Sequence, residues 1–257
     1  MRRVLTLAGL SFWLAGVGYA QESGSEGFTV RSAGAVMVVQ PPDAGEALAY
    51  LERTLADMAF FRANNYQVSL PDHPLFDGSE PPSAEAHERK TVFAEEVYQL
   101  SAFDAALGVL SGQARELQVA LERIAGWAEH DGFKAVDSVT VTLTLYGPGG
   151  SFDPDAGEVI LWTDTQGAFK GGGGLHTIVH EMVHIAVEHG IAQPFQLQHW
   201  ERERLVDLIA QREFADLLPD YRLQGGADAP LDPFVLSTGL AGLRDAVAEY
   251  ARTSRPE

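Results

Sequence analysis

The stretch His180-Glu181-Met182-Val183-His184 has the pattern H-E-x-x-H and lies within residues 176–189, whose apolar pattern predicts a helix. Two histidines four residues apart share one face of a helix, so both imidazoles can reach a single metal ion. The other positions of this segment are almost all apolar, which predicts a helix buried on every side. Buried imidazoles need polar partners, and one metal ion supplies a partner for both. The alternative is a pair of core histidines that hydrogen-bond to protein neighbours.

A second helix is predicted downstream, from Trp200 to about Leu217. It carries Glu203 and Asp207 four residues apart, on the same face of the helix. H-E-x-x-H followed at this distance by E-x-x-x-D resembles the gluzincin metallopeptidases, the thermolysin-like branch of the zincins. The resemblance covers about residues 175–207.

This resemblance implies the roles of five side chains. His180, His184 and Glu203 would bind one zinc ion (Zn²⁺), and Asp207 would support one of the ligand histidines. Glu181 would be the general base that takes a proton from the attacking water. The implied activity is hydrolysis of peptide bonds in a peptide or protein substrate.

The family also implies a zincin-like fold, in which a strand borders the cleft and pairs with extended substrate. We expect the strand Glu158–Thr163 in that position. A further Tyr or His that stabilises the oxyanion is usual in the family. The sequence leaves four candidates for it, which are His176, His199, Tyr221 and Tyr146.

Neighbouring residues distinguish this ligand set from a different third ligand and from other zincin patterns. Glu201 is the alternative third ligand, but the residue one turn beyond it is Leu205, which cannot support a histidine. The chain has Arg202 where thermolysin-like members have an asparagine. The metzincin pattern requires glycine three residues after the second histidine and histidine three residues later, whereas Val187 and Gly190 stand there.

Charge and composition restrict the class of protein. The 257 residues carry a formal net charge of −18, so we expect repulsion from nucleic acid and from anionic membranes. The chain has no cysteine, which excludes disulfides and thiolate ligands, so any metal must be held by histidine and carboxylate.

The N-terminus has the layout of a secretory signal peptide over residues 1–20. Arg2 and Arg3 precede an apolar run from Val4 to Val17, and Gly18-Tyr19-Ala20 offers a small-residue cleavage site. The alternative is a membrane anchor of marginal length, but the apolar run is short for a span. We therefore predict an exported protein, secreted or periplasmic, without stable membrane insertion after cleavage.

Hydrophobic periodicity predicts an α+β chain with a small mixed or antiparallel sheet and several helices. Strands are expected at Phe28–Val39 (one or two), Val139–Leu145 and Glu158–Thr163. Further helices are expected from Asp43 to about Asn64 and over Ala84–Leu110, Ala114–His130 and Leu240–Thr253. The prolines between Pro71 and Pro82 predict a surface loop, Asp153–Gly157 a hairpin turn, and Gly171–Gly174 a flexible approach to the histidine helix.

The pattern favours one domain over residues 21–257, with a helical part at about 43–130 and a metal-site part at about 137–257. Three functional hypotheses follow. The first is an exported zinc metallopeptidase. The second is a catalytically silent, zinc-binding secreted protein that acts as a binding or maturation factor. The third is a structural helical domain with a coincidental H-E-x-x-H.

Overall fold

The structure is a computed structural model that describes residues 26–76, 86–223 and 229–254 of the chain. The predicted signal peptide, residues 1–20, lies outside these ranges, and so does the second half of the predicted loop Pro71–Pro82. Among the described residues, no helix is both long enough and apolar enough to cross a membrane.

Five strands of the described chain form one mixed sheet in the order β1-β2-β3-β5-β4. Strands β2, β3 and β5 are parallel, and β1 and β4 pair antiparallel at the two edges. The strands are β1 (Phe28–Ser32), β2 (Ala35–Gln40), β3 (Ser138–Thr144), β4 (Gly150–Asp153) and β5 (Glu158–Trp162). The α+β class with a small mixed sheet is confirmed.

Helices account for most of the remaining described chain. The α-helices are α1 (Ala44–Ala56), α2 (Met58–Ala63), α3 (Ala86–Val92), α4 (Asp104–Gly112), α5 (Ala114–Gly126), α6 (Gly174–Val187), α7 (His199–Glu213), α8 (Asp232–Leu236) and α9 (Leu243–Ser254). Short π or 3-10 segments are η1 (Phe93–Val97), η2 (Leu100–Phe103), η3 (Trp127–Glu129), η4 (Glu188–Ala192) and η5 (Leu240–Gly242). The predicted histidine helix corresponds to α6 continued by η4, and the predicted Glu203 helix corresponds to α7.

The prediction of one helix over Ala84–Leu110 was wrong. The described part of this range is divided into α3, η1, η2 and α4, with extended backbone at Tyr98 between η1 and η2. The Tyr98 hydroxyl donates to the Pro42 carbonyl at 2.6 Å, which ties the break to the start of α1. The break lets Phe93 pack in a small cluster with Leu51 and Phe76, whereas Phe103 joins the main core.

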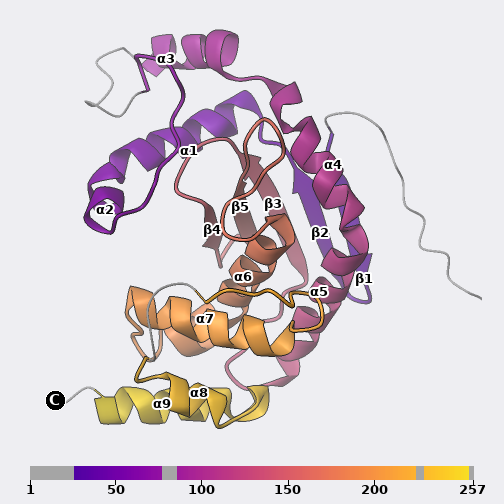
Figure 1. The fold of residues 1–257 in the computed structure, drawn as a ribbon, viewed down its shortest axis with the longest axis vertical. Helices are drawn as coiled ribbons and strands as arrows, with labels where there is room; N and C mark the ends of the chain where they lie inside the picture. The colour runs from indigo at the N-terminus through magenta and orange to yellow at the C-terminus, as the bar shows by residue number, and fades with distance from the viewer. Residues whose placement is uncertain (1–25, 77–85, 224–228, 255–257) are drawn as a thin grey trace, which may run out of the picture.

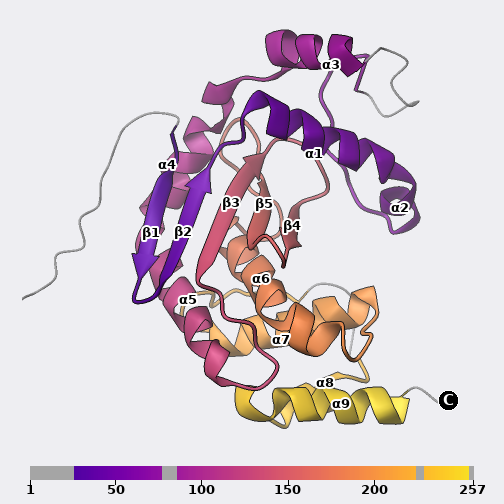
Figure 2. The same cartoon turned by 180° about the vertical axis from the view of Figure 1, so that it is seen from behind.

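Helices α4, α5 and α6 lie on one face of the sheet (Figures 1 and 2). In β2, Ala35, Met37 and Val39 are buried, whereas Val36 and Val38, which alternate with them, are half-buried. Successive strand residues point to opposite faces, so this alternation is that of a sheet with one face toward the core. The alternation of burial along β2 therefore marks the face of the sheet that packs against the core.

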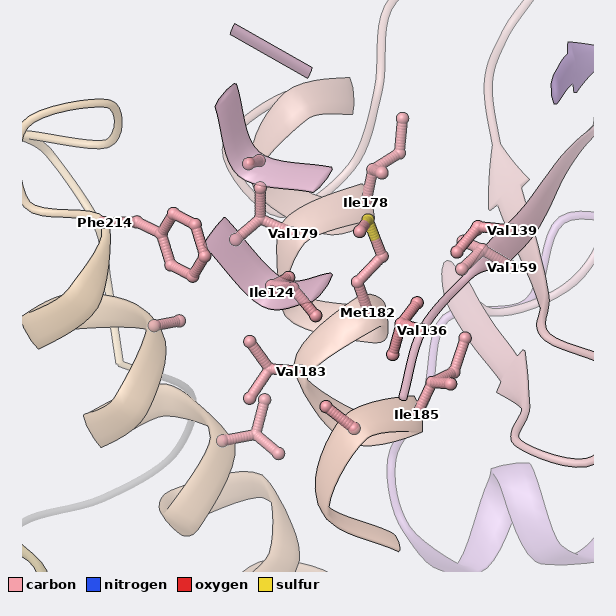
Figure 3. Close-up of a cluster of buried hydrophobic side chains, with 14 of the residues drawn as sticks. Ile124, Val136, Val139, Val159, Ile178, Val179, Met182, Val183, Ile185 and Phe214 are labelled. Carbon is pink, nitrogen blue, oxygen red and sulfur yellow. The ribbon is translucent and has the colours of Figure 1, made fainter. Parts of the chain in front are cut away.

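Helix α6 lies at the centre of the main core and is packed on two sides (Figure 3). Ile178 and Met182 lie toward the sheet, near Val139, whereas Val179 lies toward Ile124 and Phe214. Ile178, Val179, Met182 and Val183 of α6 have no exposed surface. A helix buried in this way fixes its polar side chains in position, because it has no room to rotate or shift.

The packing predicts a graded loss of stability at Ile178. We expect Ile178→Val to lower the free energy of unfolding by about 0.5–1.5 kcal/mol and Ile178→Ala by about 2–5 kcal/mol, since the close-packed site cannot collapse around the cavity. Denaturant unfolding measures both values. The matched control is Leu236→Ala at a side chain with 61% exposed surface, for which a change within about 0.5 kcal/mol is expected. Equal costs at the two positions would contradict this packing.

Candidate metal centre

Three side chains from two helices converge on one point. His180 and His184 extend from α6, and Glu203 extends from the second turn of α7. His180 Nε2 lies 3.2 Å from Glu203 Oε2, and His184 Nε2 lies 3.4 Å from Glu203 Oε1. The two Nε2 atoms are 3.1 Å apart. Two imidazole nitrogens and a carboxylate at these separations form a group that can hold a metal ion.

The Nδ1 atom of His180, on the opposite side of its ring, has polar partners. It lies 2.8 Å from the Tyr221 hydroxyl and 3.4 Å from Asp207 Oδ1, and the Tyr221 hydroxyl donates to Asp207 Oδ1 at 2.8 Å. Asp207 is fully buried on α7, one turn after Glu203. Partners on Nδ1 fix the orientation of a ligand histidine and leave Nε2 free for the metal.

His184 is held differently. Its ring stacks on Phe152 of β4, with ring centroids 4.5 Å apart and an interplanar angle of 10°. Its Nδ1 is buried and has no hydrogen-bond partner within the described part of the chain. Away from Nε2, His184 is therefore held by ring packing, whereas His180 is held by hydrogen bonds to Nδ1.

Glu181 is buried beside the two histidines, with 7% of its surface exposed. The edge strand β4 passes directly over it. A Cβ atom added at Gly150 would lie 2.3 Å from Glu181 Oε1 and 2.6 Å from Thr177 Cγ2. Only glycine allows the backbone of β4 to approach the carboxylate so closely.

The buried ionisable groups of this site shift the pKa values of His180, Glu203 and Glu181. Burial lowers the pKa of His180, but interactions with Asp207, Glu203 and Glu181 outweigh it and raise that pKa to about 10. Burial raises the pKa of Glu203, but hydrogen bonds with His180 and His184 outweigh it and hold the pKa well below its usual range. For Glu181 burial dominates, and its pKa is raised. Without a metal, a proton on His180 compensates the buried carboxylates.

The histidine and glutamate side chains line a cleft of about 570 Å³. One wall consists of α1, α2 and Tyr66 from the N-terminal half, and the other consists of α6 and the start of α7. The loop and edge strand from Pro148 to Phe152 form a third side. Figures 1 and 2 show β4 between α2 and α7 at one side of the molecule. The helical N-terminal part, which has no functional motif in its sequence, thus completes the cleft.

The expectation that strand Glu158–Thr163 borders the cleft was wrong. This strand is β5, which pairs with β3 on one side and β4 on the other. The bordering strand is β4, which forms the edge of the sheet. The hairpin turn at Asp153–Gly157 was predicted correctly, since Asp153 Oδ1 accepts hydrogen bonds from the backbone of Asp155 and Ala156. A strand before that turn could have been inferred from the strand after it.

The four candidates for a further Tyr or His lie in different places. His176 and His199 line the cleft. Tyr221 lies on the Nδ1 side of His180, where it supports the ring, and it also stacks on His176 at 4.2 Å. Tyr146 is buried in the small cluster with Phe93, outside the cleft. The positions of Tyr221 and Tyr146 therefore do not fit contact with a substrate.

Tyr66 is a cleft residue for which the sequence gives no signal. Its hydroxyl lies 2.8 Å from His199 Nε2, and His199 Nδ1 lies 3.8 Å from Glu203 Oε1. Burial, with the charges of Glu203 and Glu181, raises the pKa of Tyr66, so its hydroxyl keeps its proton at neutral pH. The rival ligand Glu201 turns away from the histidines, because Oε2 accepts from the Gln198 backbone and Oε1 accepts from Tyr250.

Comparisons of this chain with protein-family models, with curated proteins and with solved structures give no match.

The contact between β4 and Glu181 predicts different effects for two adjacent glycines. We expect Gly150→Ala to lower the free energy of unfolding by about 1–3 kcal/mol, because the new methyl group overlaps Glu181 and Thr177. Gly149→Ala is the control: its Cβ would meet no atom within 4 Å, and a change within about 0.5 kcal/mol is expected. Denaturant titration of both variants checks the difference, and an equally stable Gly150→Ala protein would contradict the observed approach.

The raised pKa of His180 predicts a pH dependence for the metal-free protein. Its folded pKa of about 10 exceeds the ordinary 6.5, so the stabilisation from the proton is complete below pH 6.5 and disappears as pH rises toward about 10. A metal ion displaces this proton, so binding of Zn²⁺ near neutral pH should release protons. Unfolding of the chelator-treated protein across this range, and calorimetry in buffers of different ionisation enthalpy, measure the two effects. Metal binding at about pH 7 without proton release would contradict the conclusion that His180 carries a proton in the metal-free protein.

Proposed function

We propose that this protein is an exported zinc metallopeptidase with a zincin-type active site, which hydrolyses peptide bonds in peptides or proteins. The observation that carries the proposal is the separation of the three ligating side chains. Ligand atoms about 2.0–2.1 Å from a tetrahedral zinc ion lie about 3.3–3.4 Å apart. The Nε2 atoms of His180 and His184 are 3.1 Å apart, and each lies 3.2–3.4 Å from one carboxylate oxygen of Glu203, His180 from Oε2 and His184 from Oε1.

The donor set suits zinc chemically. Two neutral imidazoles and one carboxylate would leave a bound zinc ion a formal charge of +1 and a fourth ligand position for water. Bound zinc would supply a Lewis acid that polarises the substrate carbonyl and lowers the pKa of a water molecule. Export is proposed from the layout of residues 1–20.

The side chains around the group have separate tasks in this proposal. Glu181 takes a proton from the attacking water and later delivers it to the leaving amine as the carbon–nitrogen bond breaks. Burial raises its pKa, which suits a group that must both accept and donate a proton near neutral pH. Tyr66, His176 and His199 line the cleft and are available as donors to the carbonyl oxygen.

The exposed edge of the sheet supports a peptide as substrate. β4 is an edge strand beside Glu181, so it offers backbone groups to an extended chain. The net charge of −18 disfavours a nucleic-acid substrate.

Substitution of Glu181 tests the proposal directly. We expect Glu181→Gln to bind one zinc ion per chain and to hydrolyse a peptide library about 10²–10⁴-fold more slowly than the parent, because the general base is lost. Zinc content is measured by elemental analysis and hydrolysis by mass spectrometry. A parent protein that binds zinc but cleaves no peptide would favour the silent zinc-binding alternative.

A matched pair of glutamates on α7 tests the ligand set. Glu203→Ala should lose about 10-fold or more in zinc affinity, since it removes one of three protein ligands. Glu201→Ala is the control, because Glu201 caps α7 and contacts Tyr250. Undiminished zinc affinity in Glu203→Ala would overturn the assignment of this residue.

A further inference from the structure

Four aromatic rings lie in contact beside the cleft, and we call them the aromatic shelf: Phe60, Tyr66, His199 and Trp200. Phe60 belongs to α2 and Tyr66 to the segment that follows it, whereas His199 and Trp200 open α7. Residues more than 130 positions apart in the chain are thus brought together, as the 2.8 Å contact between Tyr66 and His199 shows. Both ribbon views place α2 and α7 on either side of β4 (Figures 1 and 2).

The rings of the aromatic shelf hold one another in place. Phe60 stacks on Tyr66 with centroids 6.2 Å apart, and it meets His199 edge-on at 6.4 Å. His199 packs against Trp200 at 4.7 Å. The Tyr66 hydroxyl and His199 Nε2 partner each other. The aromatic shelf is therefore preformed, and an incoming group would meet mainly apolar ring surface.

The two outer rings are unusually exposed for their size. Phe60 has 50% and Trp200 53% of its surface exposed, and the other exposed large apolar side chains of the described chain are Leu100, Val109 and Leu236. A contiguous exposed apolar surface costs solvation free energy and commonly marks a site of interaction. Aromatic rings are also the side chains that contribute most to such contacts.

The aromatic shelf is continuous with the proposed catalytic cleft. Phe60, Tyr66 and His199 line the same cleft as Glu181, and His199 Nδ1 lies 3.8 Å from the ligand atom Glu203 Oε1. A peptide that lies along β4 and reaches Glu181 would therefore place a nearby side chain against these rings. The net charge of −18 disfavours an anionic membrane surface as the occupant.

We infer that the aromatic shelf binds an aromatic or large aliphatic side chain of the peptide substrate and thereby selects the bond that is cleaved. This inference rests on the proposed peptidase function and adds to it the chemical class of the preferred residue. The contact is made by ring stacking and apolar burial, to which Phe60 and Trp200 contribute the largest free surfaces.

The test uses blocked alanine hexapeptide amides in which one position at a time carries Phe, Leu, Lys, Glu or Ala. The parent protein with zinc should cleave the best Phe or Leu peptide at least about 10-fold faster, as kcat/KM, than the all-alanine peptide. Phe60→Ala and Trp200→Ala should each reduce this ratio by several-fold. Leu236→Ala and Val109→Ala are matched controls at exposed apolar positions outside the cleft, and they should keep the parent ratio.

A binding measurement separates failure of this inference from failure of the proposed function. Calorimetry of zinc-loaded Glu181→Gln with the same peptides should show tighter binding of Phe than of Ala peptides, lost in the double variants with Phe60→Ala or Trp200→Ala. If the Phe peptides bind in this way but the parent protein cleaves none of them, the peptidase proposal is wrong and the aromatic shelf is still supported as a binding site for apolar side chains. Turnover with equal rates for Phe and Ala peptides would overturn the aromatic shelf alone. The inference would also be overturned if the parent protein shows no preference among the peptides but binds phosphatidylcholine vesicles, and Phe60→Ala abolishes that binding.

Discussion

The burial of α6 is the constraint on which the rest of the site depends. This helix is apolar on nearly every side, so packing against the sheet, α5 and α7 places it in the middle of the core. The same packing carries two imidazoles and a carboxylate into a region with little water. Desolvated polar groups cost several kcal/mol each unless they find partners. The polar side chains of α6 find these partners on the neighbouring elements of the fold.

Helix α7 supplies most of them. Glu203 faces both Nε2 atoms, and Asp207, one turn later, supports His180 together with Tyr221. The carboxylates of Asp207 and Glu203 lie against His180 and raise its pKa, so His180 is protonated in the metal-free protein at neutral pH. A metal cation at this position would compensate the same buried carboxylates with a larger positive charge than the proton supplies. The buried charges therefore agree with the proposed zinc site.

The N-terminal half contributes the opposite wall of the cleft. Helices α1 and α2 and Tyr66 face α6 and α7 across the cleft, and the edge strand β4 forms its third side. Gly150 allows that strand to lie against Glu181, and Phe152 two residues later stacks on His184. One short strand therefore contacts both the proposed general base and a proposed zinc ligand, so small shifts of β4 would alter both.

The sequence by itself determined the spacing of His180 and His184 on one helix face, the apolar surroundings that bury that helix, and the alternation that defines the strands. These are local properties, because they follow from the period of a helix or a strand. Glu203 and Asp207 could also be selected, since they share a face of the next helix. The tertiary structure alone decided which strand borders the cleft, that Tyr221 supports His180, and that Phe60 and Tyr66 meet His199 and Trp200. Those contacts join residues far apart in the chain, and their geometry depends on how whole elements pack, which no local pattern records.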